Sequence, residues 1–148
     1  MPLQERLIED LKKAMRQKDD LRRSTIRFVR SAIGYEEIAQ QKPLDDAGVV
    51  SVLSRLARQH QESIAQFKLG NRPDLVAKEE AELAIVREYL PQQLTLQEIT
   101  QFVQQAIAES GAKGPAELGK VMGNLMPKVK GRADGSQVSR IVRELLGG

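Results

Sequence analysis

Apolar residues recur every three or four positions along almost the whole chain, the spacing that places them on one face of an α-helix. Between these stretches lie prolines, glycines and aspartates, which begin or end helices. The pattern predicts seven helices, which run from Leu3 to Met15, from Asp19 or Asp20 towards Gln40, from Asp45 or Asp46 almost to Gly70, from Pro73 to Leu90, from Thr95 to Gly111, from Gly114-Pro115 to Met126, and from Asp134 to Leu146. No strand-like alternation is longer than one short basic segment after Met126. The sequence therefore predicts an all-α fold.

The lengths of the helices divide the chain into two parts. The first four are joined by short breaks and have apolar stripes suited to an N-terminal four-helix antiparallel bundle, residues 1–91. Gln92 to Thr95 is the expected boundary, since Leu90-Pro91 stops one helix and Thr95 with Glu98 forms a capping box for the next. The last three helices are short and predict a small three-helix tail domain, residues 95–148.

The segment from Gly119 to Gly135 combines a glycine-marked helix with a group of cations. Gly119 and Gly123 lie on one face of the sixth helix, where each costs roughly 1 kcal/mol relative to alanine and favours close approach of a neighbouring helix or a phosphate chain to the backbone. Pro127 predicts that the helix ends at Met126. Asp134, with Gln137 three residues later, predicts a capping box for the seventh helix.

After Pro127, three cations alternate with small or apolar residues. In an extended segment Lys128, Lys130 and Arg132 project to one side, and no acidic residue nearby in the sequence neutralises them. Such a segment can follow a phosphate backbone. From charge alone, such a segment can equally be solvated. Aromatic residues make up only 3% of the chain, too few for a base-stacking surface, so if a nucleic acid binds here, its backbone or folded shape is what is recognised. The predicted RNA-binding residues are Lys120, Gly123, Lys128, Lys130, Arg132 and Arg140.

A second basic stripe lies on the second helix, where Arg23, Arg27 and Arg30 are spaced to share one face, with Arg22 beside them. Two interpretations stay open. In the first, the stripe pairs with acids on a neighbouring helix, naturally the acidic side of the fourth, or is simply solvated. In the second, it forms another contact with RNA. That acidic side consists of Glu79, Glu80, Glu82 and Glu88. Paired carboxylates can also serve acid–base or metal chemistry, but because no histidine or pocket signature accompanies these four, we interpret them as a solvated face.

Catalytic and metal-binding signals are absent from the sequence patterns. The chain has no cysteine and a single histidine, His60, which falls on an inward apolar stripe and is interpreted as a core or rim residue bonded to a neighbour. We find no phosphate-binding loop, no nucleophile and base, and no metal-ligand cluster. No cofactor and no small-molecule substrate are therefore expected. With no leader pattern and no apolar run of membrane-spanning length, we expect a soluble cytoplasmic protein without a membrane partner.

Four motifs together resemble the GatB/YqeY family: GNRPDLVAKEEAEL, YLPQQL, GKVMG and MPKVKGRADG. That family comprises stand-alone YqeY-like proteins and the tail of the GatB component of the tRNA-dependent Asp/Glu amidotransferase. The resemblance spans essentially the whole chain. It implies a helical domain followed by a tail domain, a link to tRNA, and no catalytic centre in this portion.

The resemblance leaves three functions open. The first is a non-catalytic module that binds folded tRNA. The second is an accessory or positioning component of a carbon–nitrogen ligase that uses glutamine as amido donor, working within an amidotransferase or a tRNA-synthetase-linked complex. The third is a protein-binding adaptor whose glycine face receives a partner helix.

Overall fold

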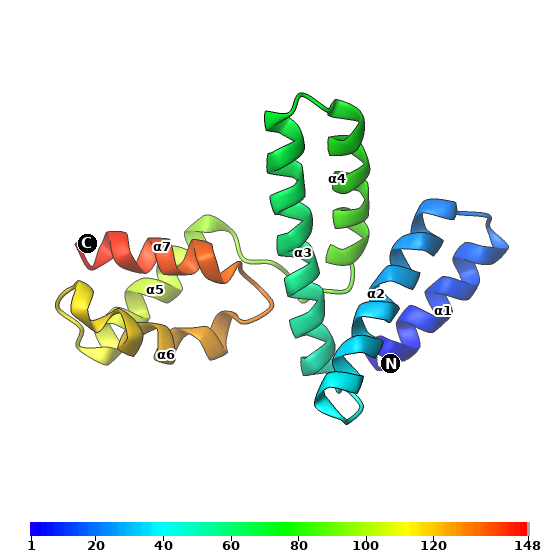
Figure 1. Ribbon diagram of the computed structural model, residues 1–148. Coiled ribbons are helices and arrows are strands. Elements are labelled where there is room, and N and C mark those ends of the chain that lie inside the picture. The colour runs from blue at the N-terminus through cyan, green and yellow to red at the C-terminus, as the bar shows by residue number, and fades with distance from the viewer. Residues whose placement is uncertain (148) are drawn as a thin grey trace. The chain divides into compact units, whose positions relative to one another are not determined.

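The computed structural model describes residues 1–147, and every regular element in that range is helical (Figure 1). The elements in chain order are α1 (Leu3–Arg16), α2 (Asp20–Gln40), α3 (Asp46–Leu69), α4 (Pro73–Arg87), α5 (Leu96–Ser110), the short 3₁₀ helix η1 (Pro115–Glu117), α6 (Leu118–Val129) and α7 (Gly135–Leu145). The prediction of an all-α fold is confirmed over the described residues. The chain divides into two compact units, Met1–Leu90 and Pro91–Gly148, each with its own hydrophobic core.

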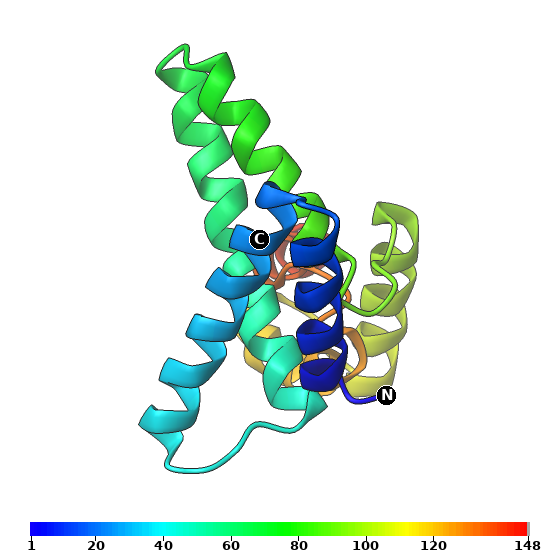
Figure 2. The ribbon, with the colours of Figure 1, turned by 90° about the vertical axis from the view of Figure 1, so that its right-hand side faces the viewer.

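The N-terminal unit is built from two helical hairpins. Helix α1 packs against α2, α3 packs against α4, and α2 contacts both helices of the second hairpin (Figures 1 and 2). The core between them is aliphatic, and its fully buried members include Leu7, Ile26, Val29, Val49, Leu53 and Val86. The finer prediction of a four-helix antiparallel bundle stays a prediction.

Aspartate side chains start two of these helices. The carboxylate of Asp19 accepts a hydrogen bond from the backbone N–H of Arg22 (3.1 Å), and that of Asp45 accepts one from Gly48 (2.9 Å). In both places the first of the two candidate aspartates is the cap. Only the residue that precedes the first helical residue can reach the unpaired N–H groups of the first turn.

The core of the N-terminal unit ends part of the way along the α3–α4 hairpin. The last buried residue of α3 is His60, and the first buried residue of α4 is Leu83. Figure 1 shows the far end of the hairpin extending beyond α1 and α2. This half of the hairpin therefore rests on half-buried contacts between its own two helices.

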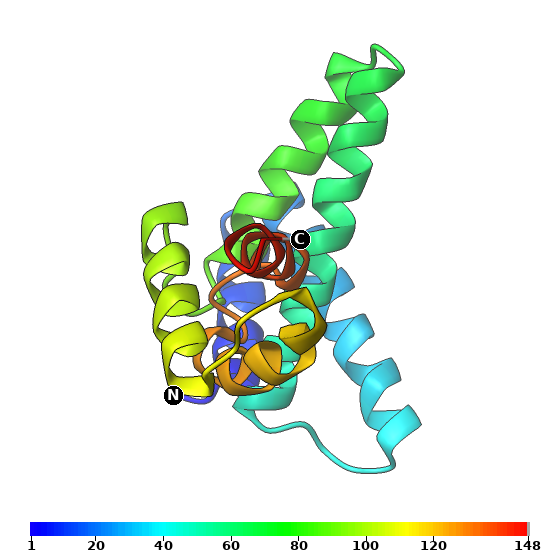
Figure 3. The same cartoon turned by 90° about the vertical axis from the view of Figure 1, so that its left-hand side faces the viewer.

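The tail unit packs α5, α6 and α7 against one another (Figure 3). The predicted capping box is present, since Thr95 accepts from the N–H of Glu98 while the Glu98 carboxylate accepts from the N–H of Thr95, each at 3.1 Å. Gly111, with φ of 69°, ends α5 in the left-handed region that favours glycine. Fully buried side chains from all three helices form the core: Val103, Val121, Leu125, Val129, Val138 and Val142.

The prediction that Pro127 ends the sixth helix is wrong. Helix α6 continues to Val129, and the N–H of Lys130 still donates to the carbonyl of Met126 at 2.9 Å. A proline inside a helix removes the hydrogen bond from its own nitrogen to the carbonyl four residues earlier, here Gly123, and its ring crowds that carbonyl, so another interaction must compensate. The side chain of Val129 is fully buried in the tail core, and this burial outweighs the local bias against helix before proline.

The predicted extended segment after Met126 is also not formed. Lys128 belongs to α6, and the next residues make a tight turn in which Lys130 has φ −56° and ψ 128°, Gly131 has φ 78°, and the N–H of Arg132 donates to the carbonyl of Val129. These values match a type II turn, whose third position requires a positive φ and hence glycine. The three cations therefore do not share one side of a strand.

Helix α7 begins as predicted at Asp134, although its cap differs in detail. The Asp134 carboxylate accepts from the N–H of Ser136 at 3.2 Å. Among the described residues, Gln137 makes no hydrogen bond back to Asp134, so the predicted capping box is not formed.

Candidate nucleic-acid interface

One side of α6 is exposed and carries cationic and small residues. Val121, Leu125 and Val129 face the core, which turns Lys120 and Gly123 towards solvent. Apart from its chain neighbours and the nearby backbone of α6, a side-chain carbon added at Gly119 or Gly123 would meet no atom within 4 Å in the described part of the chain. Packing within the chain therefore does not require glycine at either position, and the backbone there is open to a ligand.

Lys120 lies within α6, and Lys130 is the residue that caps its C-terminal end. Both side chains are exposed. Within residues 1–147, no carboxylate oxygen lies within 4.0 Å of either ammonium group. These two lysines match the expectation of cations that no acid neutralises.

Lys128 does not match that expectation. Its ammonium lies 3.1 Å from a carboxylate oxygen of Glu109 on α5, and 3.4 Å from the side-chain oxygen of Asn124. The hydrogen bond from Lys128, followed by one from Gln105, lowers the pKa of Glu109 below its ordinary value of 4.5. The expectation rested on acids close in the chain, whereas Glu109 reaches Lys128 through the packing of α5 on α6.

Arg132 follows the type II turn and is half-buried. Its Nε–H donates to the carbonyl of Gln92 at 3.4 Å. The backbone N–H of Leu94 donates to the carbonyl of Arg132 at 2.8 Å, so the segment before α5 is bound directly to this turn. The turn that carries Lys130 and Arg132 is thus held in place by the segment before α5.

Arg140 is exposed on α7, on the face opposite the buried Val138, Ile141 and Val142. No hydrogen bond or ion pair in the described part of the chain joins it to the other predicted RNA-binding residues. The structure thus brings Lys120, Gly123 and Lys128 together on α6, places Lys130 and Arg132 in the following turn, and leaves Arg140 on a separate helix.

The basic stripe of α2 is only partly paired. Arg22 makes the contact with α4 that one interpretation expected, at 2.9 Å from Glu88, and Arg23 pairs with Asp20 on its own helix at 3.0 Å. Arg27 and Arg30 are exposed, and neither pairs with a carboxylate within residues 1–147. Arg22 therefore pairs as the first interpretation expected, whereas for Arg27 and Arg30 simple solvation and a contact with RNA both stay open.

One cluster of polar side chains was not predicted from the sequence. Nδ1 of His60 lies 2.6 Å from Glu79 Oε2 and 3.9 Å from Glu82 Oε2. The expectation that His60 is buried and bonded to a neighbour is met, but the interpretation of Glu79 and Glu82 as merely solvated is not. The signal was available in the sequence, since His60 is on the inward stripe of α3 and the two glutamates are three residues apart on the helix that follows.

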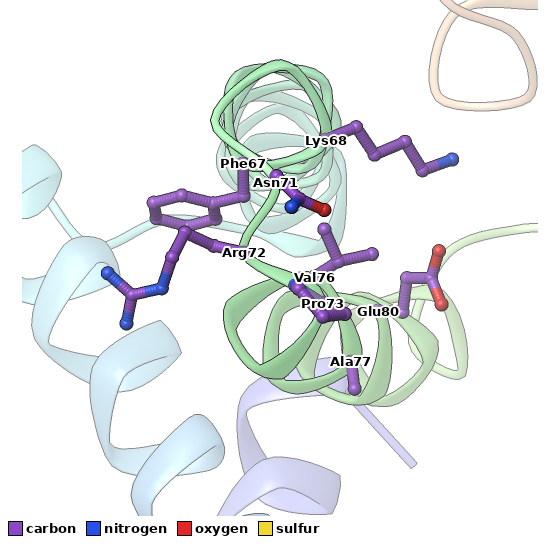
Figure 4. A pocket seen from close by; sticks show the side chains of 8 residues that line it. All are labelled: Phe67, Lys68, Asn71, Arg72, Pro73, Val76, Ala77 and Glu80. Carbon is purple, nitrogen blue, oxygen red and sulfur yellow. The ribbon is translucent and has the colours of Figure 1, made fainter.

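Two cavities adjoin the α3–α4 hairpin. One, of about 250 Å³, is lined by the His60 cluster together with Phe28, Leu56, Gln59 and Ser63. The other, of about 310 Å³, lies where α3 passes into α4, and Figure 4 shows Phe67, Lys68, Arg72 and Glu80 among its lining residues. Arg72 there is paired with Asp74 at 3.0 Å.

The fold and these sites define an all-α protein of two helical units with an exposed cationic face on its tail. The chain matches the family described as "Yqey-like protein" over residues 4–146, and it belongs to that family.

Several curated relatives are similar to this chain, and each of those described here carries the name "Altered inheritance of mitochondria protein 41, mitochondrial". The protein from Pyrenophora tritici-repentis is 33% identical over 145 residues, which are 96% of this chain and 80% of that protein. The protein from Lachancea thermotolerans is 48% identical over 87 residues (58% of this chain, 46% of that protein), and one from Saccharomyces cerevisiae is 42% identical over 84 residues (56% and 45%). The chain thus spans about half the length of two of these relatives.

The expectation of a cytoplasmic protein is corrected by these comparisons, because the curated relatives are named as mitochondrial proteins. Composition and the absence of cysteine do not distinguish one reducing compartment from another, which explains the error. None of the helices in the described range combines the length and apolar character needed to cross a membrane.

Proposed function

We propose that the tail unit binds folded RNA, with tRNA as the expected ligand, through the exposed side of α6 and the turn that follows it. The observation that carries the proposal is the pair Lys120 and Lys130, exposed near an open glycine face and without an acidic partner within residues 1–147. Ammonium groups bind phosphates and release the counterions condensed on them, which favours association. The backbone at Gly123 can approach a phosphate where a larger side chain would obstruct it.

Arg132 and Arg140 add to this surface in different ways. Arg132 sits in a turn that is held by hydrogen bonds, so little conformational entropy is lost when it meets a phosphate. Arg140 stands on the exposed face of α7 and would contact a separate part of a large ligand. Lys128 contributes least, because Glu109 already neutralises it.

The choice of tRNA among RNAs comes from the resemblance to the amidotransferase tail and from the lack of aromatic residues for stacking on unpaired bases. On this proposal the protein is not an enzyme by itself. It would present or position tRNA for a separate catalyst, of which a glutamine-dependent amidotransferase is the candidate that the resemblance suggests.

A filter-binding titration with bulk tRNA at several salt concentrations tests the proposal. The logarithm of the affinity should fall linearly with the logarithm of salt concentration, and the variant Lys120→Ala/Lys130→Ala should flatten the slope by about 0.7 to 0.9 for each phosphate contact removed. The matched control is Lys13→Ala/Lys42→Ala, which removes two exposed lysines from the N-terminal unit and should leave the slope unchanged.

Two results would count against the proposal. If no tRNA binds at about 50 mM salt, where phosphate contacts are strongest, the tail does not bind RNA, and the open glycine face is better assigned to a partner protein. If both double variants reduce the slope equally, binding reflects net charge and not the surface of α6.

A further inference from the structure

The α3–α4 hairpin brings together an imidazole and two carboxylates that could hold a metal ion. His60 comes from α3, and Glu79 and Glu82 come from α4, which runs beside it (Figure 1). One ligand atom from each of the three residues lies within 4.8 Å of the other two. Within residues 1–147 this is the one group of three such ligands found.

The sequence places these ligands through ordinary helix packing. His60 continues the inward stripe of Val49, Leu53 and Leu56 along α3. Glu79 and Glu82 are one turn apart on α4 and therefore face the same way. The tight connection between Leu69 and Pro73 sets the register of the two helices, so that His60 meets this pair of glutamates where the apolar core ends.

The charge of the cluster is not balanced by the protein. The His60 side chain is 10% exposed, and those of Glu79 and Glu82 are 21% and 20% exposed. Within the described part of the chain, no lysine or arginine pairs with either glutamate. Two partly desolvated carboxylates then face one imidazole, which carries at most a single positive charge. A divalent cation removes this imbalance, and its attraction for both carboxylates offsets their mutual repulsion.

The adjoining cavity provides room for the rest of a coordination sphere. Its volume is about 250 Å³, whereas one water molecule occupies about 30 Å³ in the liquid. Gln59 and Ser63 line the cavity and offer hydrogen-bonding groups for metal-bound water. Leu56 and Phe28 form an apolar wall, which lowers the local dielectric constant and strengthens the attraction of the carboxylates for a cation.

We propose that His60, Glu79 and Glu82 bind one divalent transition-metal ion, with Zn²⁺ as the expected ion and water in the remaining position. Zn²⁺ accepts imidazole nitrogen and carboxylate oxygen at about 2.0–2.2 Å, which places the ligand atoms about 3.3 Å apart in a tetrahedral site. The two separations from His60 Nδ1, 2.6 Å and 3.9 Å, lie on either side of this value. Mg²⁺ and Ca²⁺ prefer all-oxygen sites and should bind much more weakly.

The ion would fasten the outer half of the hairpin, where buried residues are absent from both helices between His60 and Leu83. Coordination of the ion would connect α3 to α4 in the part of the hairpin where no buried apolar residues hold the two helices together. This role is separate from RNA binding by the tail and does not depend on it.

The test uses the untagged full chain, because a polyhistidine tag would itself bind the ion. After treatment with a chelator and dialysis, titration calorimetry with ZnCl₂ should give one ion per chain, with a dissociation constant of about 10 µM or tighter. The chain has one histidine and no cysteine, so its two carbon-bound imidazole proton signals in NMR report on this site alone. Both signals should shift on addition of Zn²⁺.

Substitution of Glu82 separates a metal site from a simple hydrogen bond. Glu82→Gln keeps the shape of the side chain and does not touch the 2.6 Å contact between His60 and Glu79. A metal site requires that this variant bind Zn²⁺ about tenfold more weakly or worse, as should Glu79→Gln. The matched control is Glu80→Gln on the same helix, whose exposed side chain lies outside the cluster and whose affinity should equal that of the unsubstituted protein.

Three outcomes would overturn the proposal: imidazole signals that do not move with Zn²⁺, equal affinity in Glu82→Gln and Glu80→Gln, or binding of Mg²⁺ as tight as that of Zn²⁺. Far-UV circular dichroism of each variant establishes that the helices are intact. Should Glu79→Gln fail to fold, Glu82→Gln still decides the question, because it leaves the hydrogen bond of His60 in place.

Discussion

Residues 1–90 contain 16 basic and 15 acidic side chains, and residues 91–148 contain seven and five. Basic and acidic residues are thus nearly balanced in both units, but the two units arrange their charges differently. All but one of the ion pairs within residues 1–147 belong to the N-terminal unit, including Arg22 with Glu88 and Arg6 with Asp10. The tail has the single pair of Lys128 and Glu109.

The same contrast is found in the polar contacts between helices. In the N-terminal unit the buried hydroxyl of Tyr89 donates to Asp10 on α1, and the guanidinium of Arg6 lies 4.6 Å from the centre of the Tyr89 ring. Burial, followed by the bond to Asp10, raises the pKa of Tyr89. Several charges in this unit join its own helices, whereas most cations of the tail have no acidic partner within residues 1–147. Net charge alone would not have distinguished the two units.

The largest effects should come from the two cores, which test whether the units are independent. Leu53 and Leu125 are both fully buried, one in each core, and truncating either to alanine should lower the free energy of unfolding by about 2–5 kcal/mol. Hydrogen exchange monitored by mass spectrometry should show Leu125→Ala weakening protection in α5, α6 and α7, and Leu53→Ala weakening it in α1 to α4. Loss of protection throughout the chain in both variants would mean that the units unfold together.

The capping box of α5 should have the next largest effect. Thr95→Ala removes the acceptor for the N–H of Glu98 and should destabilise the tail by about 1 kcal/mol. Urea denaturation followed by circular dichroism measures the change. Thr95→Ser, which keeps the hydroxyl, is the control and should recover most of the stability; equal loss in both variants would indicate that the methyl group and not the cap matters.

Gly123→Ala should separate stability from function in the tail. Because an added methyl group meets nothing within 4 Å, the substitution should stabilise α6 by about 0.5–1 kcal/mol through helix propensity. If a phosphate approaches the backbone at this point, tRNA binding should weaken even though the fold is more stable. A more stable variant with unchanged tRNA affinity would exclude Gly123 from the interface.

Local patterns in the sequence were sufficient for the elements of this fold. The stripes of Val121, Leu125 and Val138, Val142 have helical spacing and are buried as that spacing requires. The Thr95 and Glu98 capping box depends on residues three apart, so it too could be read directly from the sequence. These features need no knowledge of which helices pack together.

Features that depend on tertiary packing could not be obtained in the same way. Pro127 remains inside α6 because Val129 is drawn into a core built by three helices. The partner of Lys128 is 19 residues away on α5, and the partner of His60 is 19 residues away on α4. In each case the local rule was sound, but a contact between different helices changed the outcome.

Glu109→Gln tests whether the single ion pair of the tail restrains its binding surface. Loss of the carboxylate frees the ammonium of Lys128 and removes a negative charge near α6, so tRNA affinity should rise a few-fold and the salt slope should steepen by about 0.7 to 0.9. Glu144→Gln removes an equal charge from exposed α7 and is the control. Equal gains in both variants would assign the effect to net charge and not to Lys128.

Acidification should produce the smallest effect, and in the tail it should act through two glutamates. Backbone and side-chain hydrogen bonds with Thr95 lower the pKa of Glu98, and the bond from Lys128 lowers that of Glu109, in each case below 4.5. When the pKa of a carboxyl group is lower in the folded than in the unfolded state, the group stabilises the fold at pH values above its unfolded pKa. This contribution is lost as the pH falls through the pKa of the folded state. The urea concentration at which half of the tail is unfolded should therefore decrease once the pH is below 4.5 in the unsubstituted chain. It should decrease less in Glu98→Gln/Glu109→Gln. Glutamine at position 98 can still accept the capping hydrogen bond but does not titrate, so parallel pH profiles in the two proteins would show that neither carboxylate contributes.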